Sequence, residues 1–186
     1  MNSISSATTP ELVVLLDENG HSIGSASKTE VHCNDTPLHL AFSCYVFNPA
    51  GQLLVTRRAL GKRTWPGVWS NSCCGHPAPD EPTEEAVHRR VREELGVALH
   101  DVRVCLPEFR YRAIDATGTV ENELCPVYTA VTADRPEPEP TEIVDWAWAE
   151  WPEFVRLAER APWAISPWAA EQAPLVANLL GNDQGR

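Results

Sequence analysis

Apolar residues occur in short runs along the N-terminal half of the chain, and turn residues separate these runs. Residues 11–16 and 38–47 are apolar enough to form strands, and N-P-A-G after the second run predicts a turn into a return strand at 52–56. The D-E-N-G sequence at 17–20 is a second turn signal. Residues 66–82 are rich in Gly, Pro, Ser and Asn and predict a loop. We therefore expect strands rather than helices before this loop.

A helical period follows the loop, in the sequence E-P-T-E-E-A-V-H-R-R-V-R-E-E-L-G at residues 81–96. Val87, Val91 and Leu95 recur every four residues and form one apolar stripe. A proline suits the first turn, acidic residues follow it, and Gly96 is suited to cap the end. The pattern predicts a helix that packs one face on a core and exposes a charged face.

The second half of the chain returns to strand patterns and ends in helices. A Pro- and Glu-rich linker is expected at 134–142. The expected elements are strands at about 97–105, 108–114, 119–131 and 143–149, and helices at about 151–160 and 169–180. Strands that flank one central helix, together with a helical end, predict an α+β sandwich of mixed sheets.

The length of 186 residues is typical of one compact domain. We expect a disordered tail at 1–10, a single catalytic domain at 11–182 and a short tail at 183–186. No apolar run approaches the ~20 residues that span a bilayer, and the N-terminus does not resemble a secretory signal. The six cysteines include no C-x-x-C pair and are expected to be reduced, which favours a cytoplasmic protein.

Charge narrows the classes of partner. The chain carries 15 basic and 26 acidic residues, a formal net charge of −11. The chain has no long basic run, so we do not expect it to bind nucleic acid through the phosphate backbone. We do not expect a membrane partner either. An acidic protein that binds an anionic substrate needs a local basic pocket or metal ions.

Several residues have the chemistry of a metal site. His32 and His39 lie seven residues apart, and His76 follows two cysteines and a glycine. Glu121 and Glu123 lie two apart in an expected strand, so both face one side, roughly 7 Å apart at the backbone. Each histidine alone is more often a surface or core residue than a ligand. Together, imidazoles and carboxylates suit one divalent ion such as Mn²⁺, Zn²⁺ or Mg²⁺.

The loop and central helix resemble the Nudix box, in which a loop, a helix and a second loop hold a metal against a diphosphate. The match spans 23 residues, from residue 75 to 97. Arg90 stands where the hydrolases of that family carry the first Glu of an R-E pair, while Glu93 and Glu94 remain as candidate metal ligands. Exchanging a carboxylate for a guanidinium removes a metal ligand and adds a bidentate phosphate donor.

The chain also resembles the type 1 isopentenyl-diphosphate delta-isomerases over roughly residues 11–170. The resemblance lies in the segments LHLAFSCYVFNPAGQLLVTRRALGKRTWPGVWSNSCCGHP, FRYRA, ENELCPVY and PWAISPW. It implies a Nudix-like α/β/α sandwich and a double-bond shift through protonation, a tertiary carbocation and deprotonation. It assigns the proton transfers to Cys74, as a thiolate, and to Glu123, with Tyr111 beside it.

The same resemblance implies how a small-molecule diphosphate would be held by a monomeric enzyme. Trp163 would face the carbocation. A Mg²⁺ that arrives with the substrate would bind Glu94 and the main-chain carbonyl of Cys74. The implied diphosphate-binding residues are Lys28, Arg58, Lys62 and Arg90.

Two other classes remain open on the sequence alone. A Nudix hydrolase would use the same box, although Arg90, Cys74 and the histidines argue against it. A non-enzymatic metal module built on Cys73, Cys74, His76 and His39 would lack the usual spacing of a closed zinc site.

Overall fold

The computed structural model describes residues 11–183, so the expected tails at 1–10 and 184–186 lie outside the described residues. The strands are β1 Leu12–Leu16, β2 Ser22–Ser27, β3 His39–Leu40, β4 Phe42–Phe47, β5 Gln52–Arg58, β6 Trp69–Ser70, β7 Cys73–Gly75, β8 His100–Leu106, β9 Arg110–Ile114, β10 Val120–Leu124, β11 Val127–Val131 and β12 Ile143–Glu150. The helices are α1 Lys28–Val31, α2 Thr83–Leu95, α3 Trp151–Arg160, the short 3₁₀ helix η1 Pro162–Ala164 and α4 Pro167–Asp183. In this part of the chain no helix has both the length and the apolar character needed to cross a membrane.

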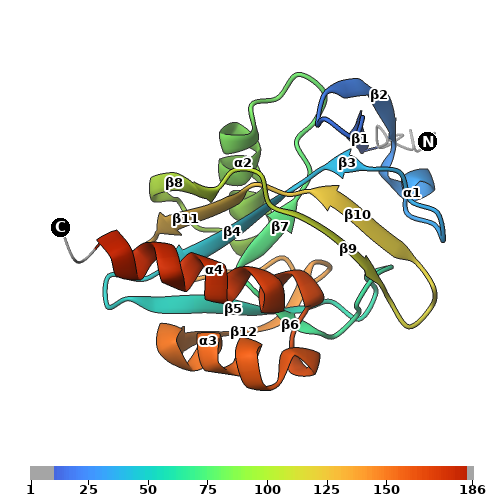
Figure 1. Cartoon of the computed structure of the whole chain (residues 1–186). Coiled ribbons are helices and arrows are strands. Elements are labelled where there is room, and N and C mark those ends of the chain that lie inside the picture. The colour runs from blue at the N-terminus through green and yellow to red at the C-terminus, as the bar shows by residue number, and fades with distance from the viewer. Residues whose placement is uncertain (1–10, 184–186) are drawn as a thin grey trace, which may run out of the picture.

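The strands form two mixed sheets (Figure 1). The larger sheet has the order β12-β5-β4-β11-β8, with β6 paired to β5 and β7 to β4. The smaller sheet has the order β2-β1-β3-β10-β9. Figure 1 shows α2 on one side of the larger sheet and α3 and α4 on the other. This arrangement confirms the predicted α+β class and the α/β/α sandwich.

Alternating side chains of the central strands divide the core between the two helical layers. Tyr45 of β4 and Leu53 of β5 pack in the cluster that includes α3 and α4. Their neighbours Cys44, Val46 and Leu54 pack in the cluster that includes α2. Because successive side chains of a strand point to opposite faces, one apolar strand supplies both cores.

The predicted helix at 81–96 is confirmed as α2. Its apolar stripe of Val87, Val91 and Leu95 is fully buried. Gly96 ends the helix with φ 68°, and its N–H donates to the carbonyl of Arg92. A left-handed residue at this position is commonly glycine, because a side chain would be strained there.

Two strands that the sequence predicted as continuous are broken. The run at 38–47 is divided between β3 and β4 at Ala41, and the run at 119–131 is divided between β10 and β11 at Cys125 and Pro126. Each run crosses from the smaller sheet to the larger one at its break. The two breaks lie side by side, because the Ala41 N–H donates to the carbonyl of Leu124 and the Ser43 N–H donates to the carbonyl of Pro126. Pro126 has no N–H to donate, which helps to end the ladder.

The prediction of a loop at 66–82 was wrong in part. Its residues include β6 and β7, two short strands that pair with β5 and β4. The sequence did not predict β2 or α1 either, because neither has a clear apolar pattern. The helix predicted at 151–160 is confirmed as α3, and α4 extends the prediction at 169–180 at both ends.

Candidate active site and metal centre

Strand pairing brings the central site residues together. Glu123 on β10 is opposite His39 on β3 in a parallel pair and opposite Tyr111 on β9 in an antiparallel pair. His32 directly follows α1, and His76 directly follows β7. Residues from five separate segments therefore meet at the junction between the two sheets.

Three of the predicted histidines and one carboxylate form a compact buried group. Each of His32, His39, His76 and Glu123 offers one ligand atom, and these atoms all lie within 4.8 Å of one another. The Nε2 atoms of His39 and His76 lie 3.4 and 3.2 Å from Oε1 of Glu123. The structure therefore brings these four side chains into one buried group.

The outer ring nitrogens are fixed by main-chain carbonyls. Nδ1 of His32 lies 2.9 Å from the carbonyl of Lys28, and Nδ1 of His39 lies 3.0 Å from that of Pro37. With Nδ1 of His39 as the donor to this carbonyl, Nε2 faces Glu123 as an acceptor, and this buried Nε2 has no hydrogen-bond partner. Two acceptors then face each other, so a divalent cation between imidazoles and carboxylate fits this donor set.

Glu121 lies beside the compact group rather than within it. Its Oε2 is 2.9 Å from Nε2 of His32, and its Oε1 accepts a hydrogen bond of 2.8 Å from the hydroxyl of Thr64. The structure thus brings all five predicted ligands together, with Glu121 joined to the other four through His32.

The local environment separates the pKa values of these groups. Burial lowers the pKa of His76 to about 4 despite its carboxylate neighbour, so this ring is neutral at pH 7 and suited to bind a metal. Burial alone would also lower the pKa of His32, but the hydrogen bond and charge of Glu121 outweigh it and raise that pKa. Burial alone would raise the pKa of Glu123, but the rings of His39 and His76 hold it well below its usual value.

The second predicted catalytic group, Cys74 on β7, lies in the wall of the same pocket. Its sulfur contacts the side chains of Ser43 at 3.3 Å and Asn71 at 3.4 Å. Burial raises the pKa of this thiol to about 11, against the effect of the hydrogen bonds to Ser43 and Asn71. The thiol is therefore protonated at neutral pH, whereas the sequence-based expectation was a thiolate. Tyr111 donates a 2.8 Å hydrogen bond to Oε2 of Glu123, as predicted for the pair.

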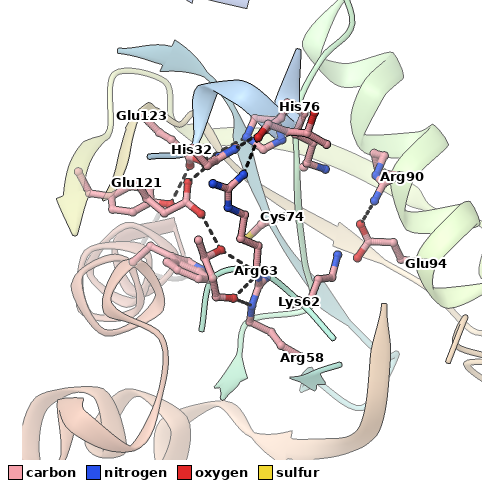
Figure 2. A pocket seen from close by; sticks show the side chains of 16 residues that line it. His32, Arg58, Lys62, Arg63, Cys74, His76, Arg90, Glu94, Glu121 and Glu123 are labelled. Atoms are coloured by element: carbon pink, nitrogen blue, oxygen red, sulfur yellow. Dashed lines mark hydrogen bonds and ion pairs between the residues drawn. The ribbon is translucent and has the colours of Figure 1, made fainter. Parts of the chain in front are cut away.

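The pocket has a volume of about 220 Å³ and a basic wall (Figure 2). The predicted cations are all in its lining, which includes Lys28, Arg58, Lys62 and Arg90 together with Glu94. In the view of Figure 2, Cys74 lies between the histidine–carboxylate group and the ion pair of Arg90 and Glu94.

Chain carboxylates neutralise three of these cations. Lys28 pairs with Glu11 at 3.0 Å, and Lys62 pairs with Glu142. Arg90 pairs with Glu94 on the next turn of α2 and, at 3.0 Å, with Glu93. Arg58 instead donates to the carbonyl of Thr64 at 3.0 and 3.2 Å. An anionic ligand entering this pocket would therefore compete with chain carboxylates for three of the four cations.

The structure corrects the predicted tryptophan. Trp163 is 86% exposed in η1 and does not line the pocket. Trp168, five residues later in the same P-W-A-I-S-P-W segment, is 3% exposed and lines it. The guanidinium of Arg58 lies 5.5 Å from the Trp168 ring. The sequence missed this residue because both tryptophans follow a proline in the motif, and only packing of α4 on the sheet distinguishes them.

Two more lining residues, Arg63 and Thr64, were also missed. They directly follow the predicted Lys62, and that adjacency was the only signal in the sequence. Thr64 links the metal-ligand group to the basic wall of the pocket, because its hydroxyl donates to Glu121 and its carbonyl accepts from Arg58.

Comparisons with known proteins agree with this geometry. A family model described as "NUDIX domain" matches residues 37–172. A protein of Agromyces mediolanus named isopentenyl-diphosphate Delta-isomerase is 58% identical over 180 residues, which cover 97% of this chain and 87% of the relative. A protein of the same name from Kocuria rhizophila is 54% identical over 96% of this chain and 100% of its own length. The chain belongs to the Nudix family and to its isopentenyl-diphosphate Delta-isomerases.

Solved structures of lower sequence identity show the same fold. The structure of DR0079 from Deinococcus radiodurans is similar with a TM-score of 0.67 at 23% identity, over 88% of this chain and 98% of that one. A MutT protein from Methanosarcina mazei Go1 is similar with a TM-score of 0.57 at 19% identity, over 74% and 91%. At these identities the likeness shows the Nudix fold alone, so the assignment to the isomerase family rests on the sequence relatives.

Proposed function

We propose that the chain interconverts isopentenyl diphosphate and dimethylallyl diphosphate in isoprenoid biosynthesis. One observation carries the proposal: the pocket wall holds a thiol, a carboxylate paired with a phenol, and four cations. The names of relatives that are 54–58% identical support the same reaction. A hydrolase is disfavoured because the first carboxylate of its box is replaced by Arg90, which pairs with Glu94.

The proposed reaction is two proton transfers. The terminal alkene carbon gains a proton, a tertiary carbocation forms, and the carbon nearer the diphosphate loses a proton, so the formula of the substrate is unchanged. An alkene is a weak base, and the acid must therefore be held close to it in a pocket from which water is excluded. Cys74 and Glu123 are the two groups proposed to give and take these protons, with Tyr111 supporting Glu123.

Two divalent ions complete the proposed site. One ion, Mn²⁺, Zn²⁺ or Mg²⁺, would be held by the His32, His39, His76 and Glu123 group with Glu121 beside it. A Mg²⁺ bound with the substrate would be held by Glu94 and the main-chain carbonyl of Cys74. When bound, such ions supply positive charge that neutralises the diphosphate and stabilises nearby carboxylates in their charged form.

The function is tested by incubating the purified protein with isopentenyl diphosphate and Mg²⁺. We expect dimethylallyl diphosphate to appear in NMR spectra, with no release of inorganic phosphate. Rapid phosphate release without a shift of the double bond would instead assign the chain to the Nudix hydrolases.

Arg90→Ala should weaken diphosphate binding and turnover together. A charge-assisted hydrogen bond contributes about 1.5–3 kcal/mol, so the loss in kcat/KM should be roughly 10- to 150-fold. Arg92→Ala is the matched control, because Arg92 lies on the same helix, is exposed and does not line the pocket. Parent kinetics in Arg90→Ala would exclude the diphosphate contact.

Trp168→Leu should reduce kcat far more than Trp163→Leu. The face of a desolvated aromatic ring stabilises a cation by about 2 kcal/mol, which corresponds to a roughly 30-fold change in rate. Trp168→Phe keeps a weaker π face and should retain part of the activity. Steady-state kinetics of the three variants will check the correction, and a larger loss in Trp163→Leu would restore the sequence-based assignment.

A further inference from the structure

A buried polar group lies beside Cys74, outside the lining of the pocket. It consists of Ser43 on β4, Asn71 between β6 and β7, and Gln172 on α4, each at most 1% exposed. None of the three lines the pocket of Figure 2. Burying polar side chains in a core is unfavourable unless their hydrogen bonds are made, so their presence there requires an explanation.

Gln172 is the least expected member. It shares one face of α4 with Ala169, Ala173 and Val176, which are fully buried and apolar. An apolar residue at Gln172 would continue that stripe. The amide instead makes two hydrogen bonds across the core: Tyr45 donates to its Oε1 at 3.2 Å, and its Nε2 donates to the Ser43 hydroxyl at 3.0 Å.

These bonds determine where the proton of Ser43 points. A hydroxyl has one proton to donate, and in Ser43 the oxygen already accepts from Gln172. The proton is left for a sulfur, either Cys74 at 3.3 Å or Cys125 at 3.5 Å. Gln172 thereby occupies one of the two acceptor positions of the Ser43 oxygen and leaves the Ser43 proton free to point to a sulfur of this pair.

The side-chain amide of Asn71 is oriented so that its oxygen accepts from the Cys74 sulfur. Its Nδ2 donates to the main-chain carbonyls of Cys44 and Cys73, both at 3.1 Å, so its Oδ1 is the atom that faces the Cys74 sulfur at 3.4 Å. Trp168 also donates to this oxygen, at 3.1 Å. The sulfur of Cys74 therefore lies between a hydroxyl that can donate to it and an amide oxygen that can only accept from it.

We propose that Gln172 is a positioning residue for Cys74, acting through the hydroxyl of Ser43. A group that both gives and takes a proton needs a hydrogen-bond partner in each state, and Asn71 and Ser43 supply one each. The role of Cys74 in turnover rests on the proposed function, whereas the orientation of its sulfur does not. The inference adds a second residue of α4 to the site, after Trp168.

The test uses Gln172→Met, which keeps the side-chain length and removes both hydrogen bonds. We expect kcat to fall about tenfold, the effect of one misdirected hydrogen bond, with KM within about twofold because no diphosphate contact changes. Ser43→Ala should give a similar loss. Adding Gln172→Met to Ser43→Ala should cost little more, because Gln172 acts through the hydroxyl that is already absent.

Val176→Ala is the control for a purely structural effect. Val176 lies one turn further along the same buried face and makes no polar contact, so this variant should lower the melting temperature and leave kcat within about twofold of the parent. Losses from Gln172→Met and Ser43→Ala that multiply in the double variant would show independent structural damage and overturn the proposal.

A measurement of Cys74 reactivity that needs no substrate turnover tests this inference separately from the proposed function. The rate at which iodoacetamide modifies Cys74 at fixed pH can be followed by peptide mass spectrometry, and we expect it to fall about fivefold in Gln172→Met and not in Val176→Ala. If the parent fails to isomerise its substrate, the proposed function fails and this measurement still stands. Unchanged modification of Cys74 in Gln172→Met would overturn the positioning role.

Discussion

Cys74→Ala should remove nearly all isomerisation while leaving the fold intact. The alanine keeps the β7 backbone and its pairing with Ser43 but has no proton to transfer. Removal of one general acid–base group typically costs about 10²- to 10⁴-fold, and the loss should reach the upper end because no other thiol lines the pocket among the described residues. NMR detection of dimethylallyl diphosphate gives the rate, and thermal unfolding shows whether the fold is retained.

Cys73→Ala is the matched control, one residue away on the same strand. Cys73 is 3% exposed and packs in the α2 cluster, on the opposite face from the pocket. Its loss should lower stability modestly and spare kcat. Equal rates for Cys74→Ala and the parent would remove Cys74 from the reaction, and a large loss of kcat in Cys73→Ala would show that the two cysteines had been assigned the wrong way round.

The elements with a strong local signal could be predicted from the sequence. The α2 helix has an apolar stripe of three residues spaced four apart and a glycine at its end, and both were found as expected. The breaks at Ala41 and Pro126 could not be predicted, because they depend on which sheet each half of an apolar run joins. These breaks direct His39 and Glu123 to the junction where the metal group forms, so the least predictable feature of the fold is the one that places the site.

In the candidate site, too, some residues could be predicted from local sequence patterns and others could not. Ligand types at motif spacing indicated the three histidines and two glutamates, and all five converge. The choice between Trp163 and Trp168 depends on how η1 and the first turn of α4 pack on the sheet, which no local pattern reports. The role of Gln172 depends on a hydrogen bond between residues 129 positions apart in the chain.

Exchanging His39 and His76 together for glutamine should empty the proposed metal group. Glutamine is close in size to histidine and can still donate to Glu123, so the buried carboxylate keeps partners while two of the four clustered ligands are lost. Changes even to the groups that orient metal ligands cost about 10- to 100-fold in affinity, and loss of two ligands should exceed the upper value. We expect the parent to retain one divalent ion per chain by elemental analysis after dialysis, and the double variant to retain almost none.

The matched control exchanges His88 and His100 for glutamine, since both are exposed and lie outside the group. This control should keep the metal content and activity of the parent, which separates loss of the site from loss of any two histidines. Adding excess Mn²⁺, Zn²⁺ or Mg²⁺ to the double variant should restore binding only at concentrations above those the parent requires, and isomerisation should recover with it. Full metal occupancy in the double variant after dialysis would mean that the ion is held elsewhere, and the buried histidines would then have to be explained as a hydrogen-bonded support for Glu123.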